Sequence, residues 1–160
     1  MAPERLRSAS GRDGADDVRP PIRVVLADDH GFMRRSLRHV LDADADLSVV
    51  AEASDMTAVM RHIRVDRPDV LVLDAGIPAG PILSSIRELR SAVPDTAIVL
   101  TTMTADDRLA REAIAAGASG YVLKDSADAD LIEAIRRAAS GRSFVASAAA
   151  RGSREQTPEG

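Results

Sequence analysis

The sequence has 160 residues, a formal net charge of -4, 45% hydrophobic residues and 2% aromatic residues. A chain of this length can bury one core, and with so few aromatic residues that core must be aliphatic. The scarcity of aromatic side chains and the acidic balance argue against a nucleic-acid surface built on base stacking. The sequence contains no cysteine, which excludes a disulfide framework and a thiolate metal site and fits a reducing cytoplasm.

Residues 1–21 are predicted to form a flexible N-terminal segment. They carry mixed charges, Gly and Ser without apolar periodicity, and they close on Pro20 and Pro21. No apolar run in the sequence is long enough to span a bilayer, so we expect a soluble cytoplasmic protein. The folded domain is predicted over residues 22–145, and residues 146–160 are expected to form a flexible tail.

From residue 22 onward, short aliphatic runs alternate with amphipathic stretches, which predicts strands alternating with helices. In chain order we expect a strand at 22–27, a helix at 31–41, a strand at 47–51, a helix at 56–65, a strand at 70–74, a helix at 82–90, a strand at 97–102, a helix at 106–116, a strand at 120–123 and a helix at 128–139. Ser54 or Asp55 can cap the second helix. Gly117 can end the fourth helix, and Ser126 can cap the fifth.

This alternation predicts a parallel five-stranded sheet with helices on both faces, because right-handed crossovers place successive helices over the sheet. The fold class is therefore a doubly wound α/β sandwich of the flavodoxin type. A strand order of 2-1-3-4-5 suits the sequence, since it makes the first and third strands neighbours at the switch point where such sheets bind ligands.

Those same two strands end abruptly in carboxylates. The apolar run at 24–27 stops at Asp28 and Asp29, and the run at 70–73 stops at Asp74. Because the carboxyl ends of parallel strands share one edge, the three acids are expected to share one small site. Their mutual repulsion in a partly dry pocket favours a site that holds a hard divalent cation.

The motifs at these positions resemble a known family. Val-Leu-Ala-Asp-Asp-His at 25–30, Pro-Asp-Val-Leu-Val-Leu-Asp at 68–74, Pro78, and Ala-Gly-Ala-Ser-Gly-Tyr-Val-Leu-Lys-Asp at 116–125 are similar to the receiver domains of two-component response regulators. The similarity is greatest to the NarL/FixJ (LuxR-type) branch, whose fold is CheY-like, and it covers roughly residues 22–145. Each motif alone is weak, but their order and ungapped spacing make the match specific.

The resemblance implies that Asp74 accepts a phosphoryl group from a sensor histidine kinase, or from a small donor such as acetyl phosphate. It implies that Mg²⁺ is bound by Asp29 and Asp74 directly, by Asp28 largely through water, and by the backbone carbonyl of Gly76. Lys124 would supply a fixed positive charge beside the transferred group.

The resemblance also implies a switch. Spacing from Pro94 and Lys124 places Thr102 at the family's hydroxyl position, with Thr101 as the neighbouring alternative. The Thr102 hydroxyl would bond the new phosphoryl oxygen, and Tyr121 would move inward. The face formed by the fourth helix, fifth strand and fifth helix would change as a result, and a homodimer is one expected consequence.

Several residues have simpler interpretations. The histidines His30, His39 and His62 are predicted to be surface or cap residues, because no pair has the spacing of a metal site. The Arg34-Arg35 pair is predicted to lie on a solvated helix face. Alone, Asp28 and Asp29 would be interpreted as a helix cap, and only their combination with Asp74 and Lys124 favours a site.

The sequence departs from the family after Asp74. Pro81 and Ile82 occupy the positions where an Asp-Gly or Asn-Gly turn is usual, so a phosphorylation-independent interaction module remains an alternative. A haloacid-dehalogenase-like phosphatase needs a second Asp where Gly76 stands, and no Gly-rich phosphate loop follows any strand. The protein is therefore expected to be a regulator rather than an enzyme.

The last residues, Gln-Thr-Pro-Glu-Gly at 156–160, resemble the start of the helix-turn-helix domain that follows such receivers. The chain is expected to be either a receiver excised from a transcription factor or a single-domain regulator, with the first favoured. It should reach DNA only through a helix-turn-helix domain that this sequence lacks.

Overall fold

The computed structural model describes residues 19–146, and these form a six-stranded sheet in the order β2-β1-β3-β4-β5-β6. Every neighbouring pair of strands is parallel. The strands are β1 (Ile22–Ala27), β2 (Leu47–Ala53), β3 (Val70–Asp74), β4 (Ala97–Thr102), β5 (Gly120–Leu123) and β6 (Phe144–Ala146). The helices are α2 (Gly31–Asp42), α3 (Met56–Asp66), α4 (Ile82–Ala92), α5 (Asp107–Ala116) and α6 (Asp128–Ala139).

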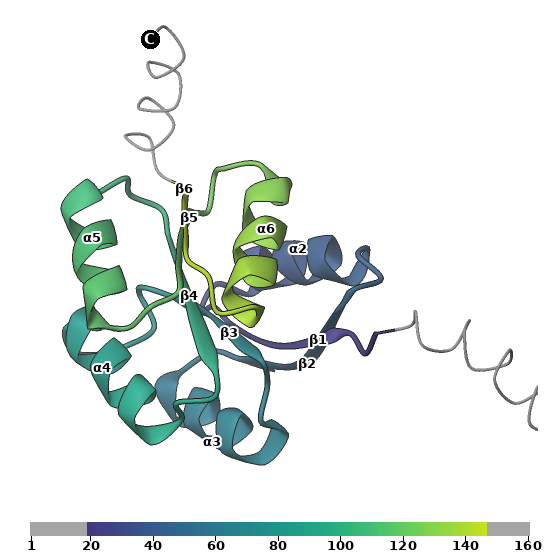
Figure 1. Cartoon of the computed structure of the whole chain (residues 1–160), viewed down its shortest axis with the longest axis horizontal. Coiled ribbons are helices and arrows are strands. Elements are labelled where there is room, and N and C mark those ends of the chain that lie inside the picture. Colours follow the sequence, from purple (N-terminus) through teal and green to yellow (C-terminus); the bar gives the residue numbers. More distant parts are fainter. Residues whose placement is uncertain (1–18, 147–160) are drawn as a thin grey trace, which may run out of the picture.

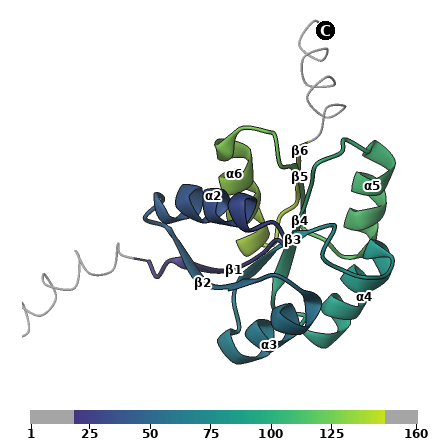
Figure 2. The ribbon, with the colours of Figure 1, turned by 180° about the vertical axis from the view of Figure 1, so that it is seen from behind.

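The helices cover both faces of the sheet, as the doubly wound prediction requires. Helices α2 and α6 lie on one face, and α3, α4 and α5 lie on the other (Figures 1 and 2). The order 2-1-3-4-5 is confirmed for the first five strands. Within residues 19–146, no helix is both long enough and apolar enough to cross a membrane.

Two details of the predicted fold are wrong. The sheet has a sixth strand, β6, which begins after Gly141 turns the chain with a φ of 82° and pairs in parallel with β5. Three residues are too short a run to show a sequence period, so β6 was not expected. Ser126 does not cap α6: the cap residue is Ala127, and the Ser126 hydroxyl instead donates to the Leu123 carbonyl.

Two predicted helix boundaries are confirmed. Asp55 caps α3 by accepting a hydrogen bond from the Ala58 backbone N–H at 2.8 Å. Gly117 ends α5 with a φ of 123°, and a Cβ there would lie 2.5 Å from Cγ of Arg90. A side chain at this position would therefore meet both backbone strain and a steric clash.

The core consists of two aliphatic layers, one on each side of the sheet. Because side chains alternate along a strand, Val25 and Ala27 pack toward α3, α4 and α5, whereas Val24 and Leu26 pack toward α2 and α6. Strand β3 is buried along its whole length. A strand that is buried on both faces has an apolar side chain at each position, so the carboxylate that ends β3 needs its own explanation.

The lead segment predicted at 1–21 lies outside the described residues, apart from Arg19 to Pro21. The tail predicted at 146–160 also lies outside them, apart from the backbone of Ala146.

Candidate functional site

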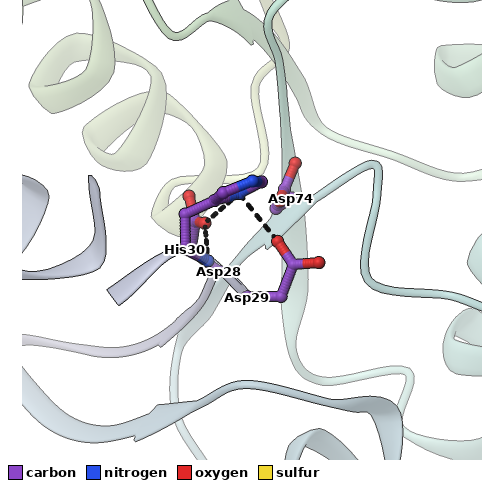
Figure 3. A group of neighbouring side chains, drawn as sticks. All are labelled: Asp28, Asp29, His30 and Asp74. Carbon is purple, nitrogen blue, oxygen red and sulfur yellow. Dashed lines mark hydrogen bonds and ion pairs between the residues drawn. The ribbon is translucent and has the colours of Figure 1, made fainter. Parts of the chain in front are cut away.

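The carboxylates at the ends of β1 and β3 meet at the carboxyl edge of the sheet, as predicted. Strands β1 and β3 are neighbours with Ala27 opposite Leu73, which brings Asp28 and Asp74 together. Asp28 is fully buried and Asp74 is 6% exposed, whereas the Asp29 side chain is 44% exposed. Figure 3 shows the three acids converging with His30 above the ends of the strands.

Lys124 joins two of these acids. It follows β5, where its backbone N–H donates to the Thr102 carbonyl, and its side chain is 2% exposed. Its Nζ lies 2.7 Å from Oδ2 of Asp28 and 3.1 Å from Oδ1 of Asp74. A single ammonium group therefore offsets the repulsion between two buried carboxylates, which would otherwise be costly to hold ionised.

Lys124 is also the only lysine among the 21 Lys and Arg residues of the sequence. A compact ammonium group can fit between two carboxylates at this depth, whereas a guanidinium is wider and binds in a planar fork. An otherwise all-arginine sequence that keeps one lysine here is a sequence signal in its own right, and it points to the same residue.

Backbone N–H groups hold the same carboxylates. The N–H of His30 donates to Oδ1 of Asp28 at 2.9 Å, and the N–H of Gly76 donates to Oδ1 of Asp74 at 3.2 Å. A Cβ at position 76 would lie 3.6 Å from Oδ2 of Asp74. A side chain at position 76 would therefore begin in ordinary van der Waals contact with the Asp74 carboxylate.

The donor set fits a hard divalent cation. Asp28, Asp29, His30 and Asp74 each offer a ligand atom, and these four atoms lie within 4.8 Å of one another. Carboxylate oxygens are the preferred protein ligands of Mg²⁺, which keeps its remaining positions for water and phosphate oxygens. His30 is exposed, as predicted. Its placement in this group was not expected, because no pair of histidines in the sequence has the spacing of a metal site.

Thr101 and Thr102 point to opposite faces of the sheet. Thr102 lies opposite Leu123, on the Tyr121 side, and its hydroxyl accepts from the Thr104 N–H at 3.3 Å. Thr101 lies on the other side against Leu37 and Leu131, where its buried hydroxyl has no hydrogen-bond partner. Spacing from Pro94 and Lys124 favoured Thr102 over Thr101, and the alternation of side chains in β4 places the two hydroxyls on opposite faces of the sheet.

Tyr121 already lies inward. Its ring is fully buried, and its hydroxyl donates to the Thr104 carbonyl at 3.2 Å. Thr102 and Tyr121 thus bond the backbone N–H and the backbone carbonyl, respectively, of Thr104 in the loop after β4. A movement of either side chain changes a hydrogen bond of that loop.

Burial raises the pKa of the Tyr121 phenol above its usual value of about 10, because desolvation disfavours the phenolate. The folded state then keeps this proton to a higher pH than the unfolded state. Tyr121 therefore does not alter stability below about pH 10, and it destabilises the fold as the pH rises from there toward the folded-state pKa. We expect Tyr121→Phe to lose stability less steeply than the parent above pH 10 in urea unfolding.

Tyr121 is the only tyrosine in the sequence, which has no tryptophan, so phenolate absorbance follows this single residue. Ionisation of the folded protein at the same pH as the unfolded protein in urea would contradict the expected shift.

Arg34 corrects another expectation, because it does not lie on a solvated helix face. Its Nη1 donates to the Asp28 backbone carbonyl at 2.7 Å, and its Nε contacts Oε1 of Glu52 at 2.9 Å. Glu52 also pairs with Arg38, and this hydrogen bond is the main reason that the pKa of Glu52 is lowered. Helix α2 and strand β2 therefore fix the backbone of the residue that supplies a buried carboxylate.

The loop after Asp74 leads into α4, a helix whose N-terminus has no side-chain cap. The Ile77 N–H donates to the Asp74 carbonyl at 3.0 Å, and α4 begins after Pro81 without a side-chain cap. Proline pre-sets φ at this position, here −61°, so the helix starts cleanly although the usual Asp-Gly turn is missing. The departure noted in the sequence changes this connection and leaves the acids in place.

A six-stranded doubly wound sheet with three acids and one lysine at the carboxyl ends of its strands defines a CheY-like receiver fold. The chain belongs to the response regulator receiver domain family, whose model it matches over residues 24–136. This match covers most of the chain and includes the three acids and Lys124.

The relatives are transcription regulators of the NarL and LuxR type. The chain is 41% identical over 130 residues to the DNA-binding transcriptional activator DevR/DosR of Mycobacterium tuberculosis, covering 81% of this chain and 59% of that protein. A LuxR-family two-component response regulator from Aurantimonas is 32% identical, with a TM-score of 0.75 over 85% of this chain and 98% of that chain. The isolated receiver domain of RcsB from Salmonella enterica, determined with the phosphomimetic BeF3-, is 25% identical, with a TM-score of 0.74 over 82% of this chain and 97% of that chain.

Proposed function

We propose that Asp74 accepts a phosphoryl group from the phosphohistidine of a sensor kinase in a Mg²⁺-dependent reaction. The observation that carries this proposal is the contact of Lys124 with both Asp74 and Asp28 at the end of a sheet whose family consists of receivers. The chain spans 59% of the length of DevR/DosR, so the activity of a longer regulator is part of the proposal.

A carboxylate oxygen of Asp74 attacks the phosphorus atom, the P–N bond to the donor histidine breaks as a P–O bond forms, and the imidazole leaves with the electron pair. The transition state carries its charge on the phosphoryl oxygens, so a fixed cation contributes more than covalent help. Lys124 is such a cation, held 3.1 Å from Asp74 before any phosphate arrives. Mg²⁺ held by Asp29 and Asp74, with Asp28 acting largely through water and Gly76 through its carbonyl, would neutralise the same oxygens.

The phosphorylated state is read out through Thr102 and Tyr121. The Thr102 hydroxyl leaves the Thr104 N–H to bond the phosphoryl oxygen, and the loop between β4 and α5 moves with it. Tyr121 bonds the carbonyl of the same Thr104, so its ring and the face formed by α5, β5 and α6 respond together. This face controls dimerisation and a DNA-binding output outside these 160 residues, in keeping with the DNA-binding function that DevR/DosR is named for.

Valine substitutions separate Thr102 from its neighbour. Thr102→Val should abolish the change in Tyr121 fluorescence on addition of Mg²⁺ and beryllofluoride, because valine cannot bond the phosphoryl mimic. Thr101→Val should keep the change, and it should raise the free energy of unfolding by about 1 kcal/mol by removing a buried hydroxyl without a partner. The reverse pattern would assign the switch to Thr101.

Intact mass spectrometry tests the central proposal. Incubation with acetyl phosphate and Mg²⁺ should add one phosphoryl group to the parent and none to Asp74→Asn. Asp95→Asn is a matched control, since Asp95 is exposed in the loop before β4, at the opposite edge of the sheet. Absence of the adduct with acetyl phosphate and with a cognate kinase would favour the alternative, a phosphorylation-independent interaction module.

A further inference from the structure

We propose that His30 is a fourth protein ligand of the metal, and that its imidazole shifts the preference of the site from Mg²⁺ toward first-row transition ions such as Mn²⁺. This inference rests on the metal-dependent function proposed above. It concerns the one donor of the group that is not an oxygen atom.

The position of the imidazole nitrogen supports direct coordination. Nδ1 of His30 lies 2.9 Å from Oδ1 of Asp29 and 3.6 Å from Oδ1 of Asp28 (Figure 3). Two ligand atoms at about 2.1 Å from an octahedral ion are about 3 Å apart when adjacent and about 4.2 Å apart when opposite. The 2.9 Å separation from Asp29 matches that of two adjacent ligand atoms on one ion. The 3.6 Å separation and the widest one, 4.8 Å, are larger than the adjacent spacing, so binding of the ion requires side-chain rotations that draw these atoms together.

The backbone of His30 is already fixed relative to the site. Its N–H donates to Asp28, and its carbonyl accepts from Arg34 in the first turn of α2. Only the rotation of the side chain is left to bring the ring over the acids. Arg34 also bonds the Asp28 carbonyl, so the end of β1 and the start of α2 are linked by a side-chain hydrogen bond.

The ring can change partners at little cost. The His30 side chain is 75% exposed, so exchanging its contact with Asp29 for a metal ion requires no new burial of the imidazole. Such an exposed contact contributes little to stability by itself. With Nδ1 on the metal, the Nε2 proton can remain hydrogen-bonded to water.

The chemistry of the donors sets the metal preference. Mg²⁺ prefers oxygen ligands and keeps much of its water, so a nitrogen donor adds little to its binding. Imidazole suits first-row transition ions, and their affinity for mixed N and O sites rises from Mn²⁺ toward Cu²⁺. A receiver site of three carboxylates and one imidazole should therefore bind Mn²⁺ more tightly, relative to Mg²⁺, than the same site without the imidazole.

Electron spin-echo spectroscopy of the protein with Mn²⁺ alone tests coordination directly. The full chain should show the modulation of one directly bound ¹⁴N, and His30→Ala should lose it. His39→Ala is the matched control, because His39 is an exposed histidine in α2, the helix that follows His30, and lies outside the metal group. A parent spectrum without ¹⁴N coupling, or coupling that persists in His30→Ala, would overturn the inference.

Affinities provide the second measurement. His30→Ala should weaken Mn²⁺ binding about tenfold, while Mg²⁺ binding changes less than twofold. An equal loss for both ions would give His30 a role in positioning Asp29 only and would reject the metal preference. Failure of this inference leaves the proposed function intact, because phosphorylation of Asp74 with acetyl phosphate and Mg²⁺ is measured independently by mass.

Discussion

Lys124→Met is expected to lower the free energy of unfolding by about 3 kcal/mol in the absence of divalent ions, because it leaves Asp28 and Asp74 buried without their shared cation. The same change should slow phosphorylation by acetyl phosphate about 100-fold, since the charge beside the phosphoryl oxygens is lost. Urea unfolding in chelator measures the first effect, and intact mass over time measures the second.

A double substitution separates these two roles of the lysine. Asp28→Asn combined with Lys124→Met should recover much of the stability, since one buried negative charge is removed together with the cation, while phosphorylation stays slow. Arg142→Met is a control for the loss of a positive charge at an exposed position. If Lys124→Met is as stable as the parent in chelator, the ion pairs described here do not contribute to the fold.

Asp29→Asn is expected to abolish stabilisation by Mg²⁺. An ion present at 100 times its dissociation constant stabilises the folded state by about 2.7 kcal/mol, and this gain should appear in the parent and disappear in the variant. Without Mg²⁺ the variant should be slightly more stable than the parent, because one of three neighbouring negative charges is gone. Thermal unfolding with and without Mg²⁺ measures both effects.

Asp29→Asn is thus expected to be more stable than the parent without Mg²⁺ and less stable with it, and this reversal distinguishes loss of the metal site from a general change in stability. The control Asp95→Asn removes an acid at the far edge of the sheet and should keep the full response to Mg²⁺. A variant at position 29 that responds to Mg²⁺ as the parent does would show that the metal is bound elsewhere.

The local pattern of apolar and polar residues was sufficient to predict most of the fold, because each strand or helix has a recognisable period within a few residues. Aliphatic runs with abrupt polar ends predicted β1 and β3 with their observed bounds, and the change of period predicted the helices between strands. Strand β6 was not predicted, because a run of three residues shows no period. Ser126 was predicted to cap the fifth helix, but its hydroxyl donates to the Leu123 carbonyl instead.

The candidate site was also predictable only in part. Its acids were predictable, because the carboxyl ends of neighbouring parallel strands must meet. The contacts of Arg34 and His30 were not predictable, because each depends on how the chain turns from β1 into α2 and on which atoms the first helical turn brings back over the strand end. The sequence pattern of a helix does not distinguish an arginine that faces water from one that donates to a backbone carbonyl.

The sequence by itself determined the order of the elements, the edge of the sheet that carries the chemistry and the identity of the acids, because these follow from short-range periodicity and from the direction of parallel strands. The tertiary structure decided which groups touch. Strand register brought Lys124 onto Asp28 and Asp74, and packing gave the Thr101 and Thr102 hydroxyls different surroundings. The turn from β1 into α2 placed Arg34 and His30 beside the acids. These contacts join residues from different elements, so their geometry arises only when the sheet and its helices pack together.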